Sequence, residues 1–175
     1  MKKLFAALVA LCMLCSFAMA EQQVVEFNWA DVEEAAAGID GQFVAIANTG
    51  YEMFVPSVFT EMELTEEQVA NGFISILTTE DQSCAITIFW QDLGDLTIED
   101  YENVLKESGA QELEYGLLNG VPALSYSMEA DGVETASVVV DVDDTMVMTI
   151  NFAPVSDEGF SAVAAIMTCS IRRAE

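Results

Sequence analysis

The chain has 175 residues, of which 53% are hydrophobic, and it carries 30 acidic side chains against five lysines and arginines, for a formal net charge of −25. A negative charge of this size repels phosphate backbones and anionic lipid at long range, so the composition excludes nucleic acid from the expected partners. The apolar content is too high for a disordered acidic tail, and the length suits one domain with its own core.

The first twenty residues have the pattern of an export signal. Lys2 and Lys3 precede an apolar run to Cys15, and Ala18-Met19-Ala20 follows as an A-x-A cleavage site. We therefore expect residues 1–20 to be a signal peptide cleaved after Ala20, and residues 21–175 to be a secreted or extracytoplasmic mature chain. Cleavage would remove two lysines and no acidic residue, so the formal charge would change from −25 to −27.

The leader does not predict a membrane anchor. Its apolar run is about 15 residues long, shorter than the roughly 20 that a helix needs to cross a bilayer, and no second run of that kind follows. Leucine precedes both Cys12 and Cys15, which disfavours lipoprotein processing at either cysteine. We expect no membrane span after signal removal.

The first elements of the mature chain are a helix and two strands. Asn28 is an N-cap residue with Asp31 three positions on, the apolar side chains of Trp29, Val32 and Ala36 share one face, and Gly38 ends the helix. Strand patterns follow at 43–47 and 52–55, separated by Thr49-Gly50.

The sequence pattern in the middle of the chain predicts two strands and the helix with the clearest start and end signals. The acidic residues 61–67 are typical of a solvated loop and a helix start. The two strands follow at 73–78 and 84–90. Thr97 and Asp100 form a capping-box pattern, and an apolar stripe including Tyr101 and Leu105 leads to a stop at Gly109.

The last third predicts a meander and a terminal helix. Strand patterns occur at 112–117, 123–128, 137–142 and 146–152, joined by turn sequences such as Asn119-Gly120. A helix starts at Ser156 and buries Phe160 and Met167, and Arg172 and Arg173 follow its end, where positive charge suits the helix dipole.

Consecutive tight turns place neighbouring strands antiparallel. We therefore predict an α+β fold for residues 21–175, a single domain with one mostly antiparallel sheet flanked by helices in an α/β/α sandwich.

The residue types argue against an enzyme. The chain has no histidine, which removes the commonest general base and metal ligand and the usual third member of nucleophilic triads. No cofactor motif is present. A histidine-free enzyme that uses paired carboxylates stays open as an alternative, because 30 acidic side chains supply many pairs at a suitable spacing.

Calcium is a second alternative. Asp141, Asp143 and Asp144 place carboxylates at a strand end and turn, and Ca²⁺ takes oxygen ligands. The spacing does not match the EF-hand loop, and aspartates are common in turns because of their local hydrogen bonds.

Two cysteines of the mature chain, Cys84 and Cys169, leave two readings open. In an exported protein an even pair is consistent with a disulfide, whereas buried thiols that pack as small apolar groups are the other.

Aromatic side chains near Pro56 are candidates for an interface. Tyr51, Phe54 and Phe59 flank the loops there, and exposed aromatic side chains are typical of binding surfaces.

Four segments of the sequence resemble those of the PsbP-like superfamily, which includes DcrB-like envelope proteins. They are Tyr51-Glu52-Met53-Phe54-Val55-Pro56, Leu96-Thr97-Ile98-Glu99-Asp100-Tyr101, Leu118-Asn119-Gly120-Val121-Pro122-Ala123 and the run from Phe160 to Ile171. The resemblance implies an α/β/α sandwich and a non-enzymatic domain that binds another envelope or extracellular protein. The superfamily has no shared catalytic motif, so the resemblance assigns no catalytic role to any residue of this chain. A small-molecule or calcium-binding module remains the competing expectation.

Overall fold

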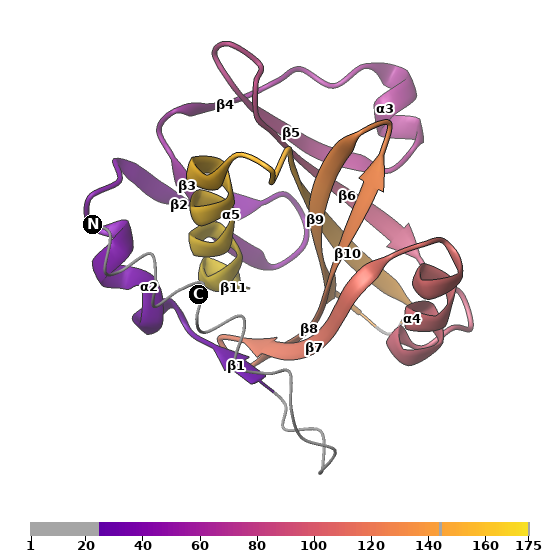
Figure 1. Ribbon diagram of the computed structural model, residues 1–175. Helices are drawn as coiled ribbons and strands as arrows, with labels where there is room; N and C mark the ends of the chain where they lie inside the picture. The colour runs from indigo at the N-terminus through magenta and orange to yellow at the C-terminus, as the bar shows by residue number, and fades with distance from the viewer. Residues whose placement is uncertain (1–24, 144, 175) are drawn as a thin grey trace.

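The computed structural model describes residues 25–143 and 145–174, which form two β-sheets and several helices (Figure 1). The predicted signal peptide, residues 1–20, lies outside the described residues. The described helices are α2 (Trp29–Ala36), α3 (Glu66–Ala70), α4 (Ile98–Glu107) and α5 (Glu158–Ser170). No helix within this part of the chain is long and apolar enough to cross a membrane.

The larger sheet has eight described strands. Their spatial order is β1 (Val25–Phe27), β7 (Gln111–Leu118), β8 (Val121–Ala130), β9 (Val133–Asp141), β10 (Met146–Ala153), β6 (Ala85–Asp92), β5 (Phe73–Thr79) and β4 (Phe59–Glu61). The smaller sheet has the order β11 (Arg172–Arg173), β3 (Tyr51–Pro56) and β2 (Gly41–Ile46).

The predicted α+β class is confirmed, but the prediction of a single antiparallel sheet is wrong. The large sheet is mixed, because β1 runs parallel to β7 while the other neighbours are antiparallel. Gly116 permits this close pairing, since a Cβ atom there would lie 2.8 Å from the carbonyl oxygen of Val25. The three residues of β1 are too few to show a strand period in the sequence.

The hairpin of β2 and β3 does not join the large sheet. The far edge of β3 pairs with β11, and the backbone N–H of Phe54 donates to the Ser170 hydroxyl at the end of α5, at 2.8 Å. These partners come from the C-terminal end of the chain, so β3 has its hydrogen bonds satisfied in a separate sheet.

The predicted helix starts are confirmed to within two residues. The Asn28 N–H donates to the Asp31 carboxylate at 3.0 Å, and the Asp100 N–H donates to the Thr97 hydroxyl at 3.1 Å. For α5 the cap is Asp157 rather than Ser156, because the Asp157 carboxylate accepts from the Phe160 N–H at 2.7 Å.

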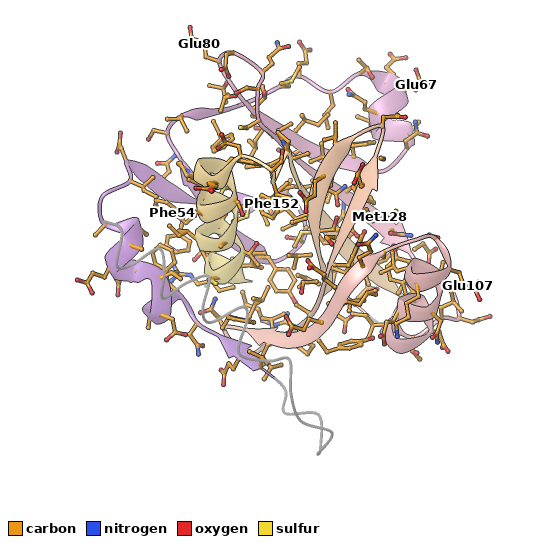
Figure 2. All side chains as sticks on the ribbon, viewed as in Figure 1. Phe54, Glu67, Glu80, Glu107, Met128 and Phe152 are labelled. Atoms are coloured by element: carbon orange, nitrogen blue, oxygen red, sulfur yellow. The ribbon has the colours of Figure 1, made fainter. Side chains whose placement is uncertain are left out.

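Apolar side chains cover both faces of the large sheet. On one face Ile150 and Phe152 of β10 pack in a cluster with Met167 of α5 and with Met53 of the small sheet. On the opposite face Val147 packs with side chains of α4. Figure 2 shows Phe152 between the large sheet and α5, while acidic side chains such as those labelled at 67, 80 and 107 project outward. The helices therefore lie on both faces of the sheet.

A third apolar cluster joins α2 to the small sheet and α5. Val32 and Ala36 of α2 are buried with Phe54 of β3 and Ile166 of α5, and Trp29 packs against them. The predicted apolar face of this helix is confirmed.

Candidate functional site

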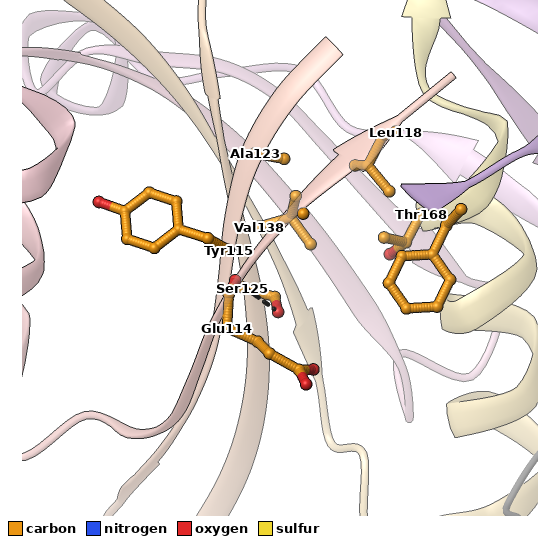
Figure 3. A pocket seen from close by; sticks show the side chains of 9 residues that line it. Glu114, Tyr115, Leu118, Ala123, Ser125, Val138 and Thr168 are labelled. Carbon is orange, nitrogen blue, oxygen red and sulfur yellow. Dashed lines mark hydrogen bonds between the residues drawn. The ribbon is translucent and has the colours of Figure 1, made fainter. Parts of the chain in front are cut away.

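The cluster between the large sheet and α5 opens to solvent at a small hollow near β7. Leu118, Ala123, Val138 and Thr168 are among the side chains that surround it, and Figure 3 shows the Tyr115 ring directed to the other side of β7. Its volume is about 50 Å³. A water molecule occupies about 30 Å³ in the liquid and ligand sites measure about 300–1,000 Å³, so the hollow is too small for an organic ligand.

A larger groove lies where the small sheet meets β4 and β5, and we call it the β2–β4 groove. It measures about 330 Å³, at the lower end of the range for ligand sites. Its apolar lining comes from Val44, Val55, Pro56, Phe59 and Leu77, and its polar lining from Asp40, Gln42, Ser57 and Glu61 together with the backbone of Gly41.

Local sequence explains why the groove forms at this place. Gly41 starts β2 against β3 so closely that a Cβ atom would lie 2.6 Å from the Phe54 ring and 2.7 Å from the Val55 carbonyl oxygen. Pro56 is the last residue of β3, and its position without an N–H faces away from β2, so the pairing with β2 loses no hydrogen bond there. The Ser57 N–H donates to the Asp40 carbonyl at 2.8 Å, and the chain then enters β4 of the other sheet. The groove is the gap that this passage between sheets leaves.

The charges on the groove are negative and no basic residue lines it. Asp40 and Glu61 are exposed carboxylates, and Glu61 accepts a hydrogen bond from the Ser75 hydroxyl at 2.9 Å. The groove therefore attracts cations and cationic side chains.

The basic side chains of the described residues are engaged with other groups. Lys106 pairs with Glu102 one turn away on α4. Arg172 donates to Glu52 at 2.7 Å and stacks over the Phe43 ring, and Arg173 lies over the Tyr51 ring. The prediction that the two arginines follow the last helix is correct, but they form β11 and contact the small sheet.

Tyr51, Phe54 and Phe59, the candidates for an interface, are buried in the folded chain, at 1%, 7% and 8% exposed. Tyr51 donates its hydroxyl hydrogen to the Asp141 carbonyl at 2.7 Å, and burial raises the pKa of this phenol. Phe54 packs against Trp29, and Phe59 packs against Phe160. Of the three, only Phe59 lines the groove. The three residues lie in β3 and β4, and side chains of α2 and α5 cover Phe54 and Phe59, which the local sequence does not show.

The described aspartates of the predicted calcium site have other roles. The Asp143 carboxylate accepts from the N–H groups of Thr145 and Met146 at 3.1 and 3.0 Å, as turn aspartates do. Asp141 is half-buried, and burial raises the pKa of its carboxyl. Asp144 lies outside the described residues. Within residues 25–143 and 145–174 no three Cys, Asp or Glu side chains gather as a metal-ligand group.

Cys84 and Cys169 are not joined in the structure. Cys84 packs against the cluster below α5, and Cys169 packs against the cluster below α2. Both cysteines are half-buried beside apolar side chains.

An enzyme that works with carboxylates needs a carboxyl group with a raised pKa inside a cleft. Asp141 has the raised pKa, but it lines neither the groove nor the small hollow.

Sequence reasoning missed Val44, Gln42 and Glu61 as lining residues. The strand pattern predicts 43–47 as a strand, but a pattern of one strand does not reveal which neighbours it has. The uncharged segment 41–46 in so acidic a chain was the available signal.

No protein-family model matches the sequence, and no curated protein matches it. Solved structures are similar in fold. Cyanobacterial PsbP (CyanoP) from Synechocystis sp. PCC 6803 is 12% identical, with a TM-score of 0.56 over 78% of this chain and 94% of that one. LpqN, described as involved in cell envelope biogenesis of Mycobacterium tuberculosis, is 14% identical, with a TM-score of 0.50 over 83% and 96% of the two chains.

A structure from Bacteroides thetaiotaomicron VPI-5482 is also 14% identical with a TM-score of 0.50, and the match covers 78% of this chain and 50% of that one. The chain therefore has a fold similar to that of cyanobacterial PsbP, which agrees with the fold that the resemblance in its sequence implied.

Proposed function

We propose that residues 21–175 form an exported, non-enzymatic domain that binds another envelope or extracellular protein. The observation that carries the proposal is the β2–β4 groove, a partly apolar recess with an acidic rim beside a sheet edge. Protein-binding sites commonly combine an apolar centre with a polar, charged rim.

Export and the envelope setting are supported by the leader pattern and by the fold. Residues 1–20 have the charge, the apolar run and the A-x-A site of a signal peptide. LpqN, whose fold is similar, is described as taking part in cell envelope biogenesis. An acidic exported domain of the same fold suits a binding role in that compartment.

The non-enzymatic role is supported by the chemistry of the side chains. The chain has no histidine, Lys106 is paired with Glu102, and the Asp141 carboxyl lies away from the groove. The groove itself offers carboxylates, an amide and a hydroxyl on an apolar floor, which suits recognition.

Affinity capture from the native host tests the proposal. Residues 21–175 with an affinity tag are exported, gently crosslinked and purified from the envelope and the medium, and the co-purifying proteins are identified by mass spectrometry. A charge-matched exported protein is the control, because an acidic chain collects cationic proteins nonspecifically. We expect one stoichiometric partner that the control lacks. Recovery of the protein alone would contradict the proposal and favour a small-molecule or calcium-binding module.

A further inference from the structure

Strand β2 is the longest open sheet edge in the described part of the chain. The other edge strands are β1 and β4 with three residues each and β11 with two, whereas β2 has six. Proteins usually protect sheet edges by making them short or by placing lysine or proline on them. Residues 41–46 of β2 contain neither, and no charged side chain.

The backbone of β2 presents hydrogen-bonding groups on its outer side. The Ser57 N–H donates to the Asp40 carbonyl, and the pairing register continues from Gly41 opposite Pro56 to Ile46 opposite Tyr51. Because hydrogen-bonded pairs alternate along an antiparallel ladder, residues 42, 44 and 46 direct their backbone groups to β3. Gly41, Phe43 and Ala45 therefore direct theirs outward, where no described strand pairs with them.

Exposed apolar side chains occur on β2 and next to both ends of β4. Val44, which lines the groove, is 39% exposed, and Val58 and Met62, beside the lining residues of β4, are 64% and 44% exposed. An exposed apolar side chain on an open strand suits a surface that receives an extended peptide.

The negative charge of this surface favours a partner segment with positive charge. Asp40 and Glu61 line the groove, and the whole chain has a formal charge of −25. A second copy of this chain would bring the same carboxylates and the same net charge to the interface, which would oppose self-pairing through β2. A cationic segment would be attracted.

We propose that an extended, basic segment of a partner protein adds as a strand to the outer edge of β2, with alternate side chains entering the β2–β4 groove. Apolar side chains contact Val44 and Phe59, and lysine or arginine side chains at the ends of the segment reach Asp40 and Glu61. The backbone groups of Gly41, Phe43 and Ala45 supply the main-chain hydrogen bonds. This inference rests on the proposed protein-binding function and names the class of segment recognised.

A synthetic peptide tests the inference without knowledge of the natural partner. Acetyl-Lys-Thr-Val-Thr-Val-Thr-Lys-amide, when extended, places two valines flanked by two lysines on one face. It is titrated into ¹⁵N-labelled residues 21–175 at physiological salt, and the amide shifts are followed by NMR. The scramble acetyl-Val-Lys-Val-Thr-Thr-Lys-Thr-amide has the same composition and charge but places valines and lysines on opposite faces.

Two lysine substitutions separate the groove from general electrostatics. Val44→Lys places a positive charge in the groove, and Val133→Lys makes the same change at a similarly exposed valine, 43% against 39%, at the start of β9. Gln42→Lys, at a second exposed groove residue, is the reserve if Val44→Lys does not fold. We expect Val44→Lys to weaken peptide binding by at least about tenfold, because like charges are then brought together.

The expected result is that shifts concentrate in residues 40–46 and 55–61, that the scramble binds more weakly, and that Val133→Lys binds like the wild type. Any of four results would overturn the inference. These are amide shifts spread over the acidic surface, equal binding of the scrambled peptide, an equal loss of peptide affinity in both lysine variants, and no amide shifts at millimolar peptide. In the affinity capture, a partner retained equally by wild type and Val44→Lys would leave the binding function standing and remove the groove from it. Failure of the wild type to retain any partner would contradict the binding function itself.

Discussion

Asn119 connects three distant parts of the chain through one side chain. Its oxygen accepts from the Trp29 N–H at 2.7 Å, and its nitrogen donates to the carbonyls of Cys169 and Ile171 at 2.8 and 2.9 Å. It also holds a φ of 49° at the turn between β7 and β8. The turn was predictable from Asn119-Gly120, but the three long-range contacts were not, because they depend on where α2 and α5 pack.

We expect Asn119→Ala to lower the free energy of unfolding by about 2–4 kcal/mol, because it removes these hydrogen bonds and leaves alanine at positive φ. Urea denaturation measures the change. The control is Asn48→Ala, since Asn48 has a similar φ of 60° but does not make these contacts. Equal losses in the two variants would show that backbone conformation alone explains the effect.

The raised pKa of Asp141 predicts that replacing its carboxyl group increases the stability of the protein, by an amount that depends on pH. Burial raises the pKa of this carboxyl in the folded state. The folded protein then binds the proton more tightly than the unfolded chain, so stability is lost as pH rises through the interval between the unfolded and folded pKa values. Asp141→Asn should therefore stabilise the protein at pH 7, with the gain disappearing below the unfolded pKa of about 3.9.

Denaturation at a series of pH values checks this prediction, with Asp95→Asn as the control for loss of one exposed negative charge. A gain at neutral pH in both variants would mean that net charge, and not burial of Asp141, is responsible. Destabilisation by Asp141→Asn at pH 7 would mean that the carboxylate has a favourable partner.

At the scale of elements, the two-residue strand β11 ties the C-terminal end of the chain to the small sheet. Arg172 pairs with Glu52 and lies 3.8 Å from the centre of the Phe43 ring. Its side chain remains 40% exposed, so solvent screens the ion pair, and the stack on Phe43 adds to it.

We expect Arg172→Ala to lower the free energy of unfolding by about 1–2 kcal/mol, from the screened ion pair and the lost stack together. Lys106→Ala makes the same charge change at an exposed pair on α4 and should cost less than about 0.5 kcal/mol. Thermal or urea unfolding of both variants measures the difference. Equal effects would show that Arg172 acts only through its charge.

How far the sequence predicts the elements depends on how local their causes are. Thr97 with Asp100 and Asn28 with Asp31 mark helix starts within four residues, and both were predictable. The assignment of β2 and β3 to a separate sheet depends on Ser170 and Arg172, more than a hundred residues away, and no local pattern shows it. The groove follows from that assignment, so it was missed for the same reason.

At the scale of the whole molecule, the charge should oppose folding at low salt. The formal charge is −25, and the basic side chains of the described residues are too few to offset it. The Debye length falls from about 30 Å at 0.01 M to about 3 Å at 1 M salt, so added NaCl screens the repulsion between carboxylates. The urea midpoint should rise with NaCl, and an unchanged midpoint would contradict strong self-repulsion.

The same experiment tests the calcium alternative at matched ionic strength. General screening predicts similar midpoints in NaCl and in CaCl₂, whereas a calcium site would add a saturable increase, since a ligand that binds only the folded state stabilises it. Asp141→Asn would abolish such an increase if Asp141 were a ligand.

Titration of the Lys-Thr-Val-Thr-Val-Thr-Lys peptide into wild type, Val44→Lys and Val133→Lys tests whether strand β2 and the β2–β4 groove receive a basic segment. We expect amide shifts centred on β2 and β4, binding weakened at least about tenfold by Val44→Lys, and wild-type binding in Val133→Lys. Equal binding by all three proteins, or shifts scattered over the acidic surface, would contradict this expectation.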